Sequence, residues 1–186
     1  MEERKENKKI SKEKVLYTAK ECTYIAVFVA MLIGSQFALS ALPGVELVTV
    51  LFVAFSYTFG IKRGMISATV FTLLRQFIFG FYPSVFLTYI IYFNGLTAWF
   101  GFLGKTIKRT FKNLVIIVLF ACVFTAIFSL LDCVITPLFY AFTWDAFVGY
   151  FAGSIPFMIS GVICNAITNA VLFYPLHRAF LLVKKI

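Results

Sequence analysis

Long runs of apolar residues dominate the chain from about residue 15 to its end. Polar and apolar positions do not alternate within these runs, so the pattern does not predict the strands of a membrane barrel. Most runs exceed the roughly 17 residues that a helix needs to cross a bilayer. We therefore predict an all-α membrane protein with six transmembrane helices. They cover about residues 15–42, 45–61, 64–81, 84–103, 113–136 and 147–176.

The last of these runs is long for a single span, and its outer part contains Gly153 and Pro156. Proline removes a backbone hydrogen bond from a helix interior, and a long apolar helix can tilt in a bilayer. We expect this part of the helix to be tilted, interfacial or broken.

Basic residues lie almost entirely in alternate connections between the predicted spans. Residues 1–20 hold seven of the 17 Lys and Arg residues. All the others except Arg75 lie in every second connection or near the C-terminus. Because cytoplasmic loops of membrane proteins are enriched in Lys and Arg, both termini are predicted to be cytoplasmic. Residues 1–14 then form a basic cytoplasmic segment, followed by one transmembrane domain over residues 15–186.

Composition agrees with a membrane domain. The chain is 61% hydrophobic and 13% charged, whereas soluble domains are about half apolar and a quarter charged. The first apolar run is too long for the core of a signal peptide. The net charge of +9 follows from the cytoplasmic segments, so it does not indicate a nucleic-acid partner.

The sequence contains few signs of catalysis. It has no HExxH, GxSxG or Walker A motif, and its acidic residues are not paired as a metal-dependent transferase would need. The single histidine, His177, is expected at the cytoplasmic surface. We predict a chain that is not an enzyme and holds no cofactor or metal. The cysteines are expected to be small buried hydrophobic residues: Cys22, Cys122, Cys133 and Cys164.

Apart from the cytoplasmic charges, the ionisable residues lie in the outer halves of spans or in outer loops: Glu46, Arg75, Asp132 and Asp145. Asp145 is expected to be solvated in a loop. Charges at the depth of Glu46, Arg75 and Asp132 usually face a protein interior or a cavity. Two interpretations stay open: one structural ion pair between Arg75 and Asp132 or Glu46, or a polar outward-facing pocket for a solute.

Uncharged polar and aromatic residues extend this candidate pocket. Asn94, Asn165 and Asn169 lie within predicted spans, where an asparagine contacts a ligand or joins two helices. The helix-joining role is expected for Asn169. Outer aromatic residues form an interfacial belt or stack on a planar ligand, and the candidates are Tyr82, Tyr89, Tyr140 and Trp144.

The charged candidates suggest which ligand groups the pocket would bind. The Arg75 guanidinium suits a carboxylate or phosphate, because its planar fork donates two hydrogen bonds at once. Asp132 or Glu46 suits an amine or a ring N–H. The predicted substrate-binding residues are therefore Glu46, Arg75, Tyr82, Tyr89, Asn94, Asp132, Tyr140, Trp144 and Asn165.

The first predicted span contains "AVFVA", in which Ala26 and Ala30 lie four residues apart. Small residues at this spacing allow a second helix to approach closely. The pair lies in the inner half of the span, away from the outer polar residues, and is the candidate partner-binding site.

With this motif, this size and six predicted spans, the chain resembles the substrate-binding S component of energy-coupling factor (ECF) transporters. The segments "PGVELVTVLFVAFSYTFG" and "AGSIPFMISGVICNAITN" are similar to segments of that family, and the resemblance covers nearly the whole chain after about residue 15. Met158 and Gly161 are less polar than the family's usual residues there, whereas Asn165 fits.

The resemblance implies a protein of the bacterial plasma membrane that binds a vitamin-like small molecule in an outward-facing pocket. It implies that Ala26 and Ala30 dock on a transmembrane coupling protein, which works with two ATPase subunits. The loop "SALPGVE" would close over the ligand.

Two other interpretations stay open. A stand-alone solute transporter or channel without an ATPase would need polar groups through to the cytoplasmic side, and the inner halves of the spans contain few ionisable residues. A membrane enzyme or assembly factor is the third.

Overall fold

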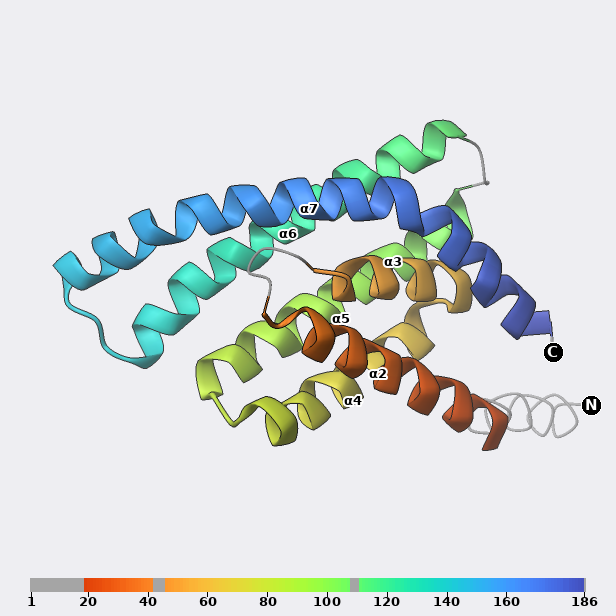
Figure 1. Ribbon diagram of the computed structural model, residues 1–186, viewed down its shortest axis with the longest axis horizontal. Coiled ribbons are helices and arrows are strands. Elements are labelled where there is room, and N and C mark those ends of the chain that lie inside the picture. Colours follow the sequence, from red (N-terminus) through yellow and green to blue (C-terminus); the bar gives the residue numbers. More distant parts are fainter. Residues whose placement is uncertain (1–18, 42–45, 108–110, 186) are drawn as a thin grey trace, which may run out of the picture.

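The computed structural model describes residues 19–41, 46–107 and 111–185, and every regular element within them is an α-helix (Figure 1). The all-helical prediction is confirmed for these ranges, and each predicted span corresponds to one helix. The basic segment 1–14, and Pro43 and Gly44 of the predicted closing loop, lie outside the described residues. The helices are α2 (Ala19–Leu39), α3 (Val48–Phe59), α4 (Ile61–Phe79), α5 (Pro83–Thr106), α6 (Phe111–Phe139) and α7 (Trp144–Lys185).

Four of the described helices are long and apolar enough to cross a membrane, namely α2, α5, α6 and α7. The 12 residues of α3 span about 18 Å at 1.5 Å per residue, less than the hydrocarbon core of about 30 Å. Helix α4 includes Lys62, Arg63 and Arg75 and is correspondingly less apolar. Length and composition therefore support four of the six predicted spans.

Helix α3 forms the centre of the protein. Its residues from Val48 to Thr58 are all buried, and it contacts α2, α4, α5, α6 and α7 (Figure 1). A helix buried on all sides is apolar all round rather than along one stripe, and the sequence "VTVLFVAFSYTF" fits this description.

Aromatic rings hold distant parts of the chain against this central helix. Phe28 of α2 stacks on Phe55 of α3 with ring centroids 3.9 Å apart. Phe180 of α7 meets both rings edge-on, at 5.8 Å from Phe28 and 5.7 Å from Phe55. Each such pair contributes about 0.5–1.5 kcal/mol beyond simple burial. The two ends of the described chain are thereby joined through α3.

Two glycines permit the close packing of α5 around the end of α3. Gly60 turns the chain from α3 into α4 with a φ of 89°, a conformation that residues with a Cβ rarely adopt. A Cβ on Gly104 of α5 would lie 2.2 Å from the carbonyl oxygen of Tyr57. Only a residue without a side chain allows this approach.

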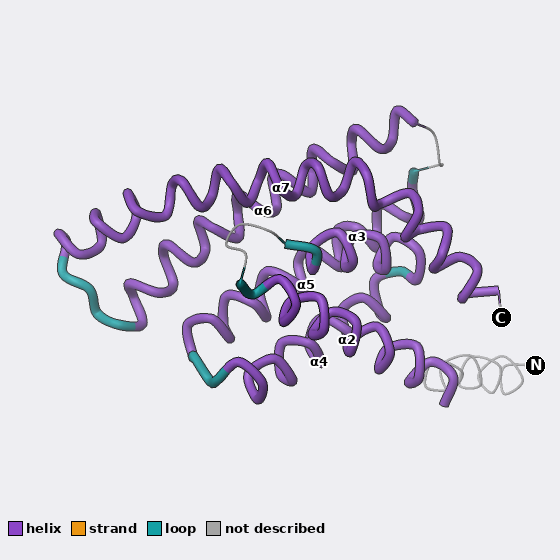
Figure 2. Tube along the Cα trace, in the orientation of Figure 1, coloured by secondary structure: helices purple, strands orange, loops and turns teal. Residues whose placement is uncertain are grey.

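Helices α6 and α7 form a hairpin that extends beyond the turn between α4 and α5 (Figures 1 and 2). Helix α7 is continuous through Pro156 and Pro175, so of the three alternatives for its outer part the break near Gly153 and Pro156 is wrong. Membrane helices tolerate proline where neighbouring groups satisfy the freed backbone carbonyl. The 42 residues of α7 span about 63 Å.

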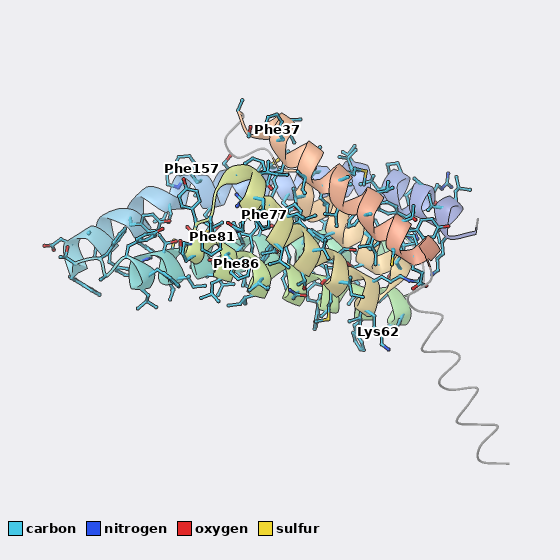
Figure 3. The ribbon with its side chains drawn as sticks, turned by 90° about the horizontal axis from the view of Figure 1, so that it is seen from below. Phe37, Lys62, Phe77, Phe81, Phe86 and Phe157 are labelled. Atoms are coloured by element: carbon cyan, nitrogen blue, oxygen red, sulfur yellow. The ribbon has the colours of Figure 1, made fainter. Side chains whose placement is uncertain are left out.

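Much of the apolar surface is exposed. The side chains of Val27, Phe77 and Trp144 are 65%, 87% and 76% exposed, and Figure 3 shows Phe77 on the outside of the bundle. None of the most apolar 18-residue stretch of α7 is buried within the protein. Soluble proteins rarely expose large apolar patches, so this surface is compatible with a membrane location.

Candidate functional site

Two cavities adjoin at Glu46 and Phe128, which line both of them. We name the first the Arg75 cavity. It has a volume of about 320 Å³ and is bordered by α2, α4, α5, α6 and the segment leading into α3. Its lining residues are Ser35, Gln36, Leu39, Ser40, Glu46, Leu47, Val48, Arg75, Phe79, Tyr89 and Phe128.

The second cavity, which we name the Asp132 cavity, has a volume of about 270 Å³ and lies between α6, α7 and Glu46. Its lining residues are Glu46, Thr125, Phe128, Ser129, Asp132, Ser154, Phe157, Met158 and Gly161. Of the predicted substrate-binding residues, the two cavities bring together Glu46, Arg75, Tyr89 and Asp132.

Arg75 is held by one hydrogen bond and by two aromatic rings. Its Nε donates a hydrogen bond to Oε1 of Gln36 at 3.2 Å. The guanidinium carbon lies 4.4 Å from the ring centroid of Tyr89 and 5.1 Å from that of Phe79, within the range of cation–π attraction. Among the described residues, none accepts a hydrogen bond from its terminal nitrogens, so these donors are available to the cavity.

Glu46 lies immediately before α3. One carboxylate oxygen accepts a hydrogen bond from the Thr49 hydroxyl at 3.1 Å. The Thr49 hydroxyl lies 3.5 Å from that of Tyr92. Because the side chain of Thr49 is buried on α3, this contact holds the carboxylate at the wall shared by the two cavities.

Asp132 is oriented by two hydroxyl groups. Thr136, one turn further along α6, donates to Oδ1 at 3.0 Å. Tyr150 of α7 donates to Oδ2 at 2.6 Å. A carboxylate can accept about four hydrogen bonds, so each oxygen keeps acceptor capacity.

The structural ion pair left open by the sequence is not formed. Neither Glu46 nor Asp132 lies within ion-pairing distance of Arg75, and the ion pair among the described residues joins Arg63 of α4 to Glu21 of α2. The three charged side chains therefore line adjoining cavities without neutralising one another through direct contact.

Asn94 connects two helices and lines neither cavity. Its Nδ2 donates to the carbonyl oxygen of Ile90 at 2.8 Å, and its Oδ1 accepts from Thr69 of α4 at 3.4 Å. The predicted contact with a solute is not supported by this placement, and the helix-joining alternative describes it better.

Asn165 has a similar role between α6 and α7. It is 1% exposed and donates hydrogen bonds to the Thr125 hydroxyl and to the carbonyl oxygen of Ala121. Asn169 donates to Asn165 within α7, not to another helix as expected. The position of Asn165 beneath Thr125 makes it a support of the Asp132 cavity and not part of its lining.

The aromatic candidates divide into two groups. Tyr89 lines the Arg75 cavity. Tyr82, Tyr140 and Trp144 are 54%, 51% and 76% exposed. Tyr82 and Tyr140 lie in the turns that follow α4 and α6, and Trp144 begins α7. They line neither cavity, and their exposure fits the interfacial belt that the sequence also allowed.

Among the residues that the sequence did not point to are Gln36 and Phe128, which line the cavities, and Tyr150, which donates a hydrogen bond to Asp132 without lining either cavity. Gln36 carried a signal, because it is a polar residue in the outer half of an apolar run. Phe128 is one of 24 phenylalanines, and Tyr150 matters only because α7 passes beside Asp132. The sequence pattern alone did not distinguish Phe128 and Tyr150 from the other aromatic residues of the apolar runs.

Two other expectations differ from the structure. His177 is buried, not at the surface, and its Nδ1 lies 2.7 Å from the Thr58 hydroxyl at the end of α3. Of the four cysteines, only Cys133 is buried, whereas Cys22 is exposed and the others are half-buried. His177 is buried because its helix, α7, packs against the end of α3, whereas Cys22 lies on the exposed surface of α2.

The site therefore combines one cation and two carboxylates within an apolar bundle, and this arrangement can bind a polar solute through charge and hydrogen bonds. Comparisons of the chain with protein-family models, with curated proteins and with solved structures found no match.

Proposed function

We propose that the chain is the substrate-binding S component of an ECF-type importer in a bacterial plasma membrane. It would bind a vitamin-like small molecule and deliver it by docking on a transmembrane coupling protein with two ATPase subunits. The observation that carries the proposal is the pair of adjoining cavities, in which Arg75, Glu46 and Asp132 lie without direct ion pairs. Charges inside a membrane domain usually mark a solute path or binding site.

The proposal includes six spans with both termini cytoplasmic. Figure 3 shows Lys62 near the start of α2, whereas Phe81 and Phe157 lie toward the opposite end. The end of α7, with its basic residues, lies at the same end as the start of α2 (Figure 1). This grouping of basic residues supports a cytoplasmic assignment for that end. Helix α3 can be short in such a topology because protein, not lipid, surrounds it.

Helix α2 has a free face for the coupling protein. Ala26 and Ala30 are both exposed, whereas Phe28 and Leu32 of the same helix are buried in the core. The small side chains would let a partner helix approach closely. The face is separate from Gln36, which lines the Arg75 cavity, so docking and solute binding use different residues.

Co-purification tests this proposal. The tagged chain, produced in cells that contain an ECF module, is expected to recover a coupling protein and two ATPases. Replacing Ala26 and Ala30 together by leucine should abolish recovery, because the larger side chains prevent close helix approach. The matched control replaces Ala152 and Ala170, two exposed alanines of α7, by leucine. It should still recover the coupling protein and the ATPases.

Recovery of no ATPase by the wild-type chain would contradict the proposal, as would full recovery by the Ala26 and Ala30 variant. Solute uptake that persists in a host without any ECF module would instead favour the stand-alone transporter.

A further inference from the structure

We infer that the two cavities hold the two ends of one bipolar molecule, with an acidic group at Arg75 and a basic amino group at Asp132. The inference rests on the proposed function in so far as it takes these cavities to be the solute site. It adds the chemical class of the solute and the place of each end.

The Arg75 cavity is built for an oxyanion. Gln36 takes the Nε donor, and Tyr89 and Phe79 flank the guanidinium. The terminal nitrogens are left without an acceptor among the described residues. A carboxylate or phosphate accepts two parallel hydrogen bonds from such a fork. The aromatic contacts hold the plane of the guanidinium before the anion arrives.

The Asp132 cavity is built for a cation or a strong donor. Thr136 and Tyr150 each occupy one acceptor position of the carboxylate, and the other positions stay available. Phe157 and Met158 line the same cavity. A carboxylate in a cavity whose walls are partly apolar is costly to keep without a counter-charge, and a ligand ammonium supplies one.

Glu46 and Phe128 connect the two ends. The Phe128 ring lies 5.6 Å from Tyr89 and 4.8 Å from Tyr92, measured between ring centroids. Glu46 uses one oxygen for Thr49 and can accept a further N–H. A planar ligand that passes between the cavities would therefore meet an aromatic wall and a second carboxylate.

The balance of charge favours a ligand that carries an amino group over a purely anionic one. When both carboxylates are ionised, the site holds Glu46 and Asp132 against Arg75 alone. A purely anionic ligand would add to this excess of negative charge in a region of low dielectric, where like charges repel strongly. A ligand with one acid and one amine adds no net charge, and it places its acid beside Arg75 and its ammonium beside Asp132. Cavities of about 320 and 270 Å³ together fall in the range of small-molecule sites.

Binding of matched probes tests the inference. The probes are 4-(ω-aminoalkyl)benzoates with one to four methylenes. Single-headed controls of equal length are 4-alkylbenzoates and ω-phenylalkylamines. Affinity is measured by calorimetry on the full chain in detergent micelles. At one chain length, the aminoalkylbenzoate is expected to bind at least tenfold more tightly than either control.

Variants assign the two ends. Asp132→Asn should remove the preference for the aminoalkylbenzoate over the 4-alkylbenzoate, while leaving the affinity for the 4-alkylbenzoate unchanged. Arg75→Gln should remove the preference for the aminoalkylbenzoate over the phenylalkylamine. If Arg75→Gln does not fold, Arg75→Lys replaces it, since lysine lacks the planar fork and should weaken binding of the acid. Asp145→Asn, on an exposed residue at the start of α7, should change neither affinity.

A bipolar probe that never binds more tightly than the better single-headed control would overturn the inference, as would a preference unchanged in folded Asp132 and Arg75 variants. These outcomes are independent of the co-purification. If the chain recovers the ATPases but shows no preference for the bipolar probe, only the inference about the ligand is contradicted. If the chain shows this preference but recovers no ATPase, only the proposed importer function is contradicted.

Discussion

Gly161 offers a way to fill the Asp132 cavity without disturbing the fold. It lies on α7 and lines that cavity. A Cβ at this position would have one neighbour within 4 Å, the Cγ2 of Thr125 at 3.8 Å, which is an ordinary van der Waals contact. The substitution Gly161→Leu should therefore be accommodated without movement of the backbone.

The expected loss of space follows from the size of leucine. If each of its four side-chain carbons occupies about the 30 Å³ of a liquid water molecule, the side chain fills roughly 120 Å³. This is a little under half of the cavity, whose volume is about 270 Å³. The amino end of a bipolar probe should no longer reach Asp132. The tenfold preference, about 1.4 kcal/mol, should then disappear.

Calorimetry and thermal unfolding in detergent together check this prediction. The variant should bind 4-alkylbenzoates as the wild type does, because the Arg75 cavity is not altered. Its melting temperature should not fall, since leucine has a higher helix propensity than glycine by nearly 1 kcal/mol. Gly153→Leu is the matched control: a Cβ there meets nothing within 4 Å, and Gly153 lines neither cavity. A folded Gly161→Leu chain that keeps the full preference for the aminoalkylbenzoate would refute the placement of the amine.

Two further predictions concern the packing that supports the site. Gly104→Ala should lower the melting temperature by several degrees, because its Cβ would lie 2.2 Å from the Tyr57 carbonyl oxygen and overpacking costs about 1–3 kcal/mol. Gly95→Ala on the same helix, where a Cβ meets nothing within 4 Å, should not, and equal melting temperatures would contradict the packing described. Asn165→Ala should cost about 1 kcal/mol by removing its hydrogen bonds to α6, including that to Thr125, and leave probe affinity unchanged. Lost affinity without lost stability would instead make Asn165 a ligand contact.

The sequence by itself determined the helices. Each predicted span matches a described helix to within a few residues at most ends. In a bilayer every backbone N–H and C=O must be satisfied within the protein, so a long apolar run has few alternatives to a helix. The same reasoning located Arg75, Glu46 and Asp132 as charges that needed a protein environment.

Which of these groups meet was decided only by the tertiary structure. Arg75 pairs with Gln36 and two aromatic rings instead of a carboxylate, and Asp132 is held by Tyr150. Hydropathy reports how apolar a segment is, but not which face of one helix turns toward another.

The depth of α3 and the burial of His177 have the same origin. Helix α3 contacts the five other described helices, and α7 packs against its end, which buries His177 of α7 beside Thr58 of α3. Burial of this kind depends on how distant helices cross, and crossing is set by the shapes of the packed side chains. No local pattern in the sequence encodes it, and the division of the site into two cavities follows from the same packing.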